Sequence, residues 1–312
     1  MKILIVGGAG YIGGFLTDYL TESGYEVTVY DNLLFEERFL KKCHFIYGDI
    51  RDTEKLSAFI NEYDCVAWLA GLVGDGACSV NPKLTHILNI ETVKWLVDNY
   101  RGKIFFPSTC SVYGVNNNLI DERADPNPLS VYAATKLEAE QYVLANAKSP
   151  LVFRLGTLFG LGDRHSRMRL DLVANILSMR AALGESLSIF GGQQWRPLLH
   201  VRDVSTAILH GLENDTEGLY NLSYKNFKIK DLGLEIREVM PDCAINYTDM
   251  KFEDLRNYRV KNDKILATGW TPSYTLNCGI KQIFNLIKEN RIKDINDIVY
   301  SNAASMRRLN DF

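Results

Sequence analysis

Tyr132 and Lys136 are four residues apart in the segment SVYAATKLEAE, whose composition predicts a helix. That spacing places both side chains on one face of the helix. A tyrosine, with a pKa of about 10 in water, is a poor base at neutral pH. An ammonium group one turn away lowers that pKa, so the pair could take a proton from a substrate hydroxyl. The same spacing also occurs on exposed helix faces that carry no chemistry.

A second group of reactive side chains follows the apolar run KIFF, at the expected end of a buried strand. The segment PSTCSVYG supplies the hydroxyls of Thr109 and Ser111 and the thiol of Cys110. Covalent catalysis by Cys110 has no neighbouring histidine in the sequence to support it, and a small buried thiol is the simpler interpretation. The residues alone leave open a nucleophile site, a proton-handling site and a polar strand end.

A glycine-rich turn near the start of the chain predicts a dinucleotide site. GGAGYIG, residues 7–13, follows the apolar strand KILIV and opens a helix, so its backbone amides can approach a pyrophosphate closely. Asp31 ends the next strand, where a carboxylate accepts hydrogen bonds from ribose hydroxyls and repels a 2′-phosphate. We therefore expect NAD, tightly bound, rather than NADP. The expected cofactor-binding residues are Gly7, Gly10, Tyr11, Ile12, Gly13, Asp31, Asn32, Asp49, Ile50, Leu69, Ala70, Gly71, Tyr132 and Lys136.

The elements that must position these residues alternate in the order of a parallel sheet. Short apolar runs and helical patterns follow one another through the first 160 residues, which predicts an α/β fold with a doubly wound parallel Rossmann sheet. We expect residues 1–160 to form the NAD-binding domain and residues 161–290 a smaller C-terminal α/β substrate lobe, from which some segments return to the sheet. Residues 291–312 are polar and weakly patterned, which favours a tail.

Composition excludes several other classes of protein. A net charge of −3 and a pI near 6.0 leave no basic field for nucleic acid or an anionic membrane. No apolar run approaches the length of a membrane span, and the six cysteines form no CxxC pair or ligand cluster for a metal. Reduced thiols in a cytoplasmic enzyme are the expectation.

Taken together, GGAGYIG, Asp31, STCSVYG and YAATK resemble the extended short-chain dehydrogenase/reductase family of nucleotide-sugar epimerases, dehydratases and dehydrogenases. RLGTLFG, WRPLLHVRDV and DLRNYRV resemble later motifs of the same family. The resemblance implies that Thr109 bonds the reacting sugar oxygen beside Tyr132, that Asn89 orients neighbouring groups, and that Arg196 and Arg256 hold the diphosphate of a nucleotide sugar. It also implies a homo-oligomer, paired through the helices around residues 86–100 and 132–147.

Two segments depart from the usual family pattern at the substrate end. Thr157 stands where many members carry an asparagine, and the loop ending at Arg169 brings three arginines that could contact substrate or a neighbouring subunit. We therefore count Thr157, Arg169, Arg196 and Arg256 as substrate-binding candidates.

The resemblance narrows the reaction without deciding it. The family's 4,6-dehydratases carry Asp-Glu where this chain has Cys110-Ser111, which disfavours dehydration. The reaction that remains is oxidation of a sugar hydroxyl, which we expect to be the hydroxyl at C4. The atypical substrate segments, and a resemblance to GDP-heptose 4-dehydrogenases of capsule biosynthesis, favour a 4-dehydrogenase. The alternative is a 4-epimerase that returns the hydride to the opposite face, and a more distant one is a non-catalytic NAD-binding regulator.

Overall fold

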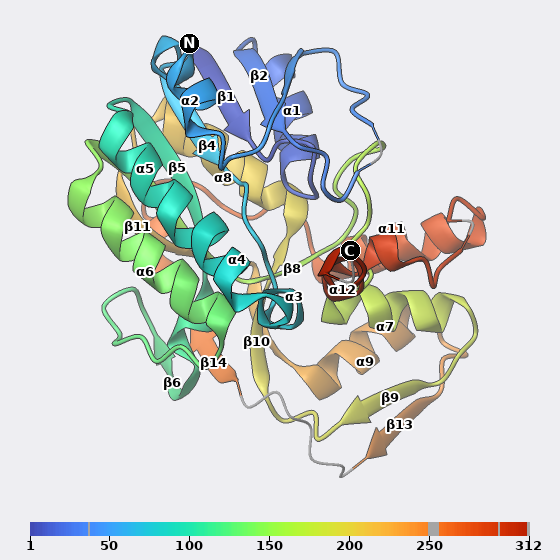
Figure 1. The fold of residues 1–312 in the computed structure, drawn as a ribbon. Helices are drawn as coiled ribbons and strands as arrows, with labels where there is room; N and C mark the ends of the chain where they lie inside the picture. The colour runs from blue at the N-terminus through green and yellow to red at the C-terminus, as the bar shows by residue number, and fades with distance from the viewer. Residues whose placement is uncertain (37, 249–255, 293, 311–312) are drawn as a thin grey trace.

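The computed structural model describes residues 1–36, 38–248, 256–292 and 294–310. A seven-stranded parallel sheet runs through its centre (Figure 1). Across the sheet the strands follow the order β11 (Gly218–Leu222), β7 (Ser149–Leu155), β5 (Lys103–Thr109), β4 (Cys65–Trp68), β1 (Lys2–Val6), β2 (Glu26–Asp31) and β3 (His44–Tyr47). The order reverses at β1, as in a Rossmann fold, and the carboxyl ends of the strands share one edge. The doubly wound parallel sheet predicted from the sequence is confirmed.

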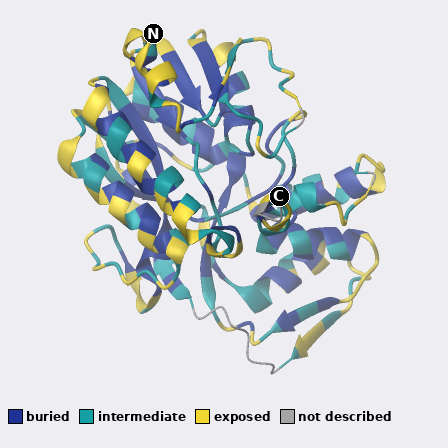
Figure 2. Ribbon diagram, viewed as in Figure 1, coloured by how far each residue is buried: buried dark blue, intermediate teal, exposed yellow. Residues whose placement is uncertain are grey.

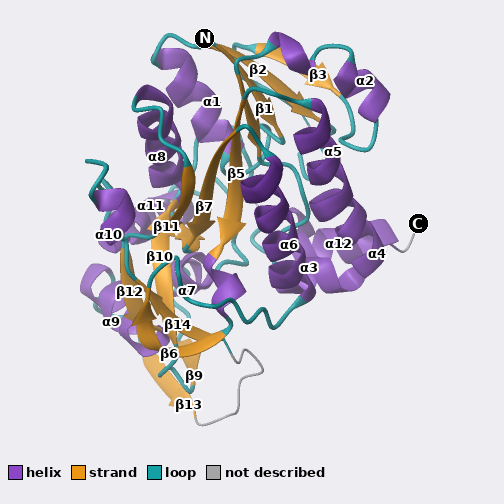
Figure 3. Cartoon of the chain, turned by 90° about the vertical axis from the view of Figure 1, so that its left-hand side faces the viewer, coloured by secondary structure: helices purple, strands orange, loops and turns teal. Residues whose placement is uncertain are grey.

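Helices cover both faces of the sheet, which explains why its strands are continuously apolar. In β1, Ile3 and Ile5 pack toward α1 (Gly13–Glu22) and α8 (Val201–Glu213). Leu4 and Val6 face the opposite side, where α5 (Thr92–Asn99) and α6 (Val131–Asn146) lie side by side (Figure 3). In Figure 2 the sheet strands are mostly dark blue, the colour of buried residues, whereas the outer sides of α5 and α6 are largely exposed.

The single helix that the apolar periodicity predicts around α5 is interrupted in the structure. Residues 84–100 read as one helix, but the structure has α4 (Pro82–His86), a π-helical turn (Ile87–Glu91) and then α5. The wider turn places Asn89 inside the protein, 3% exposed, where its amide meets the loop after β4. π turns of this kind often mark functional sites.

A smaller lobe lies below the carboxyl edge of the sheet in Figure 1. Its strands are β8 (Thr157–Phe159), β10 (Trp195–His200) and β12 (Lys225–Lys228), with β9 (Leu187–Phe190) paired to β13 (Ile245–Thr248). α7 (Val173–Ala182), α9 (Ile229–Val239) and α11 (Leu276–Lys288) enclose its apolar core. A further strand pair joins β6 (Val115–Ile120) to β14 (Asn257–Val260). The remaining short helices are α2 (Thr53–Ser57), α3 (Asp75–Val80) and α10 (Asp263–Leu266).

Two segments beyond residue 160 belong with the main sheet rather than with the lobe. α8 packs beside α1, and β11 pairs with β7 at the sheet edge. Part of the C-terminal half therefore lies at the main sheet, so the sheet and the lobe are each built from segments that are not contiguous in the chain.

The C-terminal segment is folded onto the protein, where the sequence favoured a polar tail. α12 (Asn302–Asn310) packs on α3, and its Met306 is buried with Leu72, Ala77 and Cys78. The helix has two large apolar residues, Met306 and the exposed Leu309, which is too weak a pattern to reveal this contact. Among the described residues, no helix combines the length and the apolar character needed to cross a bilayer.

Candidate active site

One cavity of about 840 Å³ opens where the carboxyl ends of the central strands meet the lobe. Its size is within the usual range for a small-molecule site. Every site residue expected from the sequence lines it: Gly7, Gly10, Tyr11, Ile12, Gly13, Asp31, Asn32, Asp49, Ile50, Leu69, Ala70, Gly71, Thr109, Tyr132, Lys136, Thr157, Arg169, Arg196 and Arg256. The fold thus brings together residues from most of the length of the chain.

The glycine turn is tight on the protein side and open on the cavity side. Gly7 has φ +83°, and a Cβ there would lie 2.5 Å from the backbone nitrogen of Ala70. A Cβ on Gly13 would lie 2.5 Å from the Cα of Gly8, whereas one on Gly10 would meet only a carbonyl oxygen at 3.6 Å. The turn therefore leaves room for a pyrophosphate against the N-terminus of α1.

Asp31 lies beside this turn with both oxygens already hydrogen-bonded. Oδ2 accepts from the N–H of Ala9 at 3.0 Å, and Oδ1 accepts from the N–H of Leu33 at 2.7 Å. Burial raises the pKa of Asp31, and these backbone hydrogen bonds oppose that rise. Each carboxylate oxygen keeps capacity for a further hydrogen bond, which fits the two hydroxyls of an adenosine ribose.

Asp49 accepts hydrogen bonds from the side chains of two neighbouring residues at the end of the cavity that also holds Asp31. Arg51 donates to it twice, at 2.9 and 2.8 Å, and the side-chain amide of Asn32 donates at 3.1 Å. These hydrogen bonds, led by those from Arg51, lower the pKa of Asp49 to about 2. The charged carboxylate therefore fixes the loop that presents Ile50 to the cavity.

Tyr132 and Thr109 meet near the middle of the cavity. Thr109 ends β5, and its hydroxyl oxygen accepts from the N–H of Ser111 at 3.1 Å. Burial raises the pKa of Tyr132, while a hydrogen bond with the Thr109 side chain and the charge of Arg169 act in the opposite direction. Without ligands, then, Tyr132 is a protonated phenol at neutral pH.

Lys136 lies one turn further along α6, with 6% of the residue exposed. Its ammonium group is 4.0 Å from the centre of the Phe106 ring, within range of a cation–π contact. Burial lowers its pKa to about 7, because the charged form is poorly solvated there. The lysine therefore changes its charge close to neutral pH.

Asn89 connects α6 to the loop after β4. Its Oδ1 accepts from the N–H of Leu72 at 2.8 Å, and its Nδ2 donates to the carbonyl of Leu72 at 2.9 Å and to Thr135 Oγ1 at 3.3 Å. Gly71 approaches this amide so closely that a Cβ would lie 2.8 Å from it. These contacts are those of an orienting residue.

Two arginines lie at the lobe end of the cavity. Arg196 donates to the carbonyl of Arg256 at 2.5 Å, and its guanidinium is 5.8 Å from the centre of the Tyr258 ring. Arg256 donates to Ser111 Oγ at 3.3 Å and forms an ion pair with Asp75 at 2.8 Å. Of the motif DLRNYRV, Asp254 and Leu255 lie outside the described residues.

Asp75 is a cavity residue that the sequence analysis missed. Its Oδ2 pairs with Arg256, and its Oδ1 accepts from Ser130 Oγ at 2.6 Å. Ser130 caps the N-terminus of α6, so Asp75 connects that helix to Arg256 at the lobe end of the cavity. The available signal was an acidic residue starting a helix just after a strand end.

Only some residues of the arginine-rich loop after β8 line the cavity. Arg167 and Arg169 line the cavity, where Arg169 forms two hydrogen bonds to Asp171 at 2.6 and 3.1 Å. Arg164 and His165 are not part of the described lining. Glu36, which the sequence analysis also missed, lies on the same side of the cavity, and burial raises its pKa to about 7.

Cys110, unlike its neighbours Thr109 and Ser111, is not part of the described cavity lining. Its thiol is buried behind β5 and donates to the carbonyl oxygen of Arg154 at 3.2 Å. Burial raises the pKa of Cys110, so the reactive thiolate form is disfavoured. The simpler interpretation of this residue, a small buried thiol, agrees with these contacts.

Cys110→Ala is therefore expected to leave kcat within about twofold of wild type and to cost on the order of 1 kcal/mol of stability. Steady-state kinetics and thermal unfolding measure both effects. Cys65→Ala, a second buried thiol at the far end of β4, is the matched control. A selective loss of kcat of more than about tenfold in the Cys110 variant would restore a chemical role for this thiol.

Comparison with known proteins agrees with this arrangement. Residues 3–223 match the sequence profile described as the NAD dependent epimerase/dehydratase family. A provisionally named UDP-glucose 4-epimerase of Methanocaldococcus jannaschii is 30% identical, over 92% of this chain and 99% of that protein. The UDP-glucose 4-epimerase of Rhizobium meliloti is 28% identical, over 88% of this chain and 93% of that protein.

Solved structures show the same fold at lower sequence identity. The UDP-glucose 4-epimerase of Thermotoga maritima, solved with UDP-glucose, is 24% identical, has a TM-score of 0.80 and matches 94% of this chain and 100% of its own. The UDP-glucuronic acid 4-epimerase of Bacillus cereus, solved with UDP-glucuronic acid and NAD, is also 24% identical, with a TM-score of 0.79 over 93% of this chain and 99% of its own. From the profile match and the near full-length relatives, this chain belongs to the NAD-dependent epimerase/dehydratase family of extended short-chain dehydrogenases/reductases, enzymes that use NAD.

Proposed function

We propose that this enzyme is a 4-epimerase of a uridine-diphosphate hexose. The observation that carries the proposal is that one cavity has the glycine turn and Asp31 at one end, Arg196 and Arg256 at the other, and Tyr132 between them. This order matches a substrate whose reacting carbon faces the cofactor while its diphosphate is held in the lobe. Relatives over nearly the whole chain are named as UDP-glucose 4-epimerases.

The cofactor end would hold NAD through the residues already described. The glycine turn leaves space for the pyrophosphate, Asp31 would take the adenosine ribose, and Lys136 would lie at the nicotinamide ribose. When bound, NAD supplies the acceptor for the hydrogen that leaves the sugar carbon and a positive charge that lowers the pKa of Tyr132.

The protein's own groups manage the proton. Tyr132 takes the proton of the sugar 4-hydroxyl as the carbon is oxidised and gives it back when the carbon is reduced. Thr109, in hydrogen-bond contact with Tyr132, holds the same sugar oxygen. Arg196 and Arg256 bind the diphosphate, a task suited to planar donor groups. Because Arg196 and Arg256 hold the substrate by its diphosphate and not by the sugar ring, the 4-keto sugar can turn within the site. Its opposite face then lies toward the cofactor before the carbon is reduced.

A 4-dehydrogenase, which the unusual substrate segments favoured, is the second candidate. It would share the oxidation step and then release both the keto sugar and the reduced cofactor. The names of the relatives support the epimerase instead, since these relatives match 92% and 88% of this chain. Dehydration stays disfavoured, because Cys110 points away from the cavity and Ser111 is no carboxylic acid.

The proposal is tested by incubating the purified enzyme with UDP-glucose, UDP-N-acetylglucosamine, GDP- and dTDP-sugars and analysing each mixture by NMR and mass spectrometry. We expect a uridine sugar to give a mixture of two 4-epimers with unchanged mass and no accumulation of free NADH. Loss of two hydrogens would instead identify a dehydrogenase, and loss of water a dehydratase. Turnover of only a GDP- or dTDP-sugar would contradict the proposed nucleotide.

A further inference from the structure

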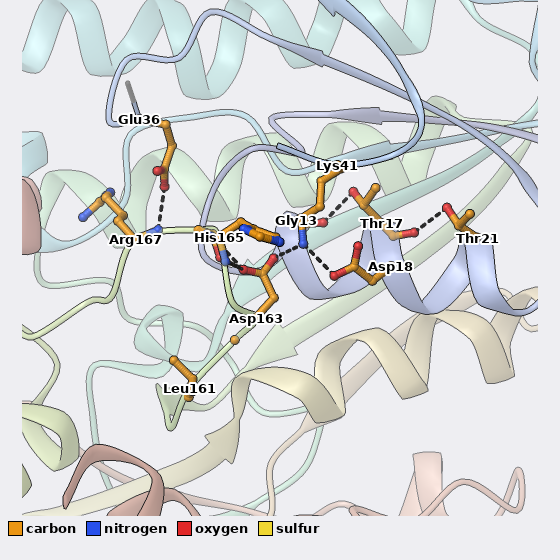
Figure 4. Close-up of polar contacts among 12 residues, drawn as sticks. Gly13, Thr17, Asp18, Thr21, Glu36, Lys41, Leu161, Asp163, His165 and Arg167 are labelled. Carbon is orange, nitrogen blue, oxygen red and sulfur yellow. Dashed lines mark hydrogen bonds and ion pairs between the residues drawn. The ribbon is translucent and has the colours of Figure 1, made fainter. Parts of the chain in front are cut away.

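Two loops far apart in the sequence meet beside the start of α1 (Figure 4). The first joins β2 to β3 and contributes Leu34, Phe35 and Glu36 to the cavity lining. The second joins β8 to α7 and contributes Arg167 and Arg169. Since Asp31 lies at the base of the first loop, the pair flanks the adenosine half of the proposed NAD site.

A buried lysine joins the two loops on the side away from the cavity. The ammonium group of Lys41 contacts Asp163 of the second loop and lies 2.6 Å from Asp18 on α1. The side chain of Lys41 is 5% exposed and that of Asp163 is 4% exposed, so both charges are screened from water. We call Lys41, Asp18 and Asp163 the loop latch.

Asp163 also organises its own loop. Its Oδ1 accepts from the N–H groups of His165 and Ser166, at 2.6 and 2.7 Å. Burial alone would raise its pKa, but hydrogen bonds from Lys41 and from these N–H groups bring it below the ordinary value. A Cβ on Gly14 would lie 2.0 Å from Asp163 Oδ2, so the loop can approach α1 this closely only because residue 14 is glycine.

The same two loops are joined a second time, at the cavity wall. The backbone N–H of Arg167 donates to Glu36 at 2.9 Å, and the Arg167 guanidinium is 4.5 Å from the centre of the Phe35 ring. Arg167 also donates to the carbonyl of Val299 at 2.8 Å and to Asn302, so the C-terminal segment is part of this wall. The wall touches the cavity, whereas the loop latch lies behind it.

We propose that the loop latch controls the release of NAD. With the latch closed, both loops stay against the adenosine half of the site and the cofactor leaves slowly. Lys41 and Asp163 are positioning residues in this scheme, since neither lines the main cavity. The benefit of slow NAD release for catalysis rests on the proposed epimerase function. An epimerase returns the hydrogen that it takes from the sugar, so it can keep the same NAD molecule from one turnover to the next. The latch itself does not depend on that function.

The buried position of the latch makes it sensitive to loss of one partner. Removing Lys41 leaves Asp163 charged and buried without its cation, which is strongly unfavourable. That cost is relieved if the loop moves out to water, so the open state becomes more populated. Because about 1.4 kcal/mol corresponds to a tenfold change in a rate or equilibrium, even a small part of this cost gives a measurable acceleration.

The experiment compares Lys41→Met with Lys42→Met, which removes the same charge from the next, exposed position of the same loop. Each protein is loaded with NAD, and dissociation is followed after adding a second NAD-binding enzyme that traps free cofactor. We expect Lys41→Met to release NAD at least about tenfold faster than wild type, and Lys42→Met to release it at the wild-type rate. Equal rates in Lys41→Met and wild type would overturn the proposal.

Asp163→Asn carries the test if Lys41→Met does not fold, because asparagine keeps an oxygen for the N–H groups of His165 and Ser166 while losing the charge. Wild-type retention of NAD in a folded Asp163→Asn protein would also overturn the proposal. No sugar nucleotide is present in this measurement, so its outcome is independent of whether the enzyme proves to be an epimerase.

Discussion

Replacing Tyr132 by phenylalanine is expected to lower kcat by roughly 10²- to 10⁴-fold, the usual contribution of a positioned acid–base group. The substitution removes only the hydroxyl, so NAD and the sugar nucleotide should still bind with affinities close to those of wild type. Steady-state kinetics on the responsive substrate, together with cofactor content after gel filtration, separate loss of chemistry from loss of binding.

Tyr142→Phe is the matched control for this prediction. Tyr142 lies on the same helix, and its hydroxyl donates to Asp98 of α5 at 2.7 Å, on the outer side of the protein. We expect it to keep wild-type kcat. Unchanged turnover in Tyr132→Phe would refute the proposed proton transfer, and an equal loss in both variants would indicate general damage to α6.

Lys136→Met is expected to abolish activity and, at the same time, to stabilise the cofactor-free protein. The reason is that burial lowers the pKa of Lys136 to about 7, far below the ordinary value of a lysine. Below pH 7 the folded protein carries the full cost of this buried charge. Between pH 7 and the ordinary lysine pKa, only the unfolded chain binds the proton, so the wild-type free energy of unfolding rises with pH.

The measurement is the Tm of cofactor-free wild type and Lys136→Met at a series of values from about pH 6 to 10. We expect the variant to be more stable, with a gap that is largest below pH 7 and shrinks as the pH rises. Lys94→Met, which removes a surface lysine paired with Glu138, should show no such gap. A Tm below that of wild type throughout would mean that the Phe106 contact outweighs the burial cost.

The cofactor half of the site could be predicted from the sequence because its signals are local. Gly7 to Gly13 lie between one strand and one helix, and Asp31 ends the next strand, so a short segment fixes each position. Tyr132 and Lys136 share a helix face for the same reason. The parallel sheet followed from continuous apolar runs alternating with helices. Thr109, Arg196 and Arg256 needed the resemblance to the family, since no local pattern connects them.

What could not be predicted depends on contacts between irregular segments. The Lys41–Asp163 pair joins loops 122 residues apart, and neither loop has a periodic pattern. Asp75 meets Arg256 only because the backbone turns at Gly74, with φ +94°. α12 is held by Met306 and by Asn302, too few residues to distinguish a docked helix from a polar tail.

The central claim, that the hydrogen taken from C4 is returned to the same sugar, is tested most directly with UDP-glucose carrying deuterium at C4. A catalytic amount of the enzyme is incubated with an excess of this substrate. The 4-epimers are then separated and analysed by mass spectrometry and NMR. We predict that the product epimer keeps its deuterium at C4 through many turnovers. Appearance of the deuterium in free NADH, with a 4-keto sugar as product, would contradict the account and assign a 4-dehydrogenase.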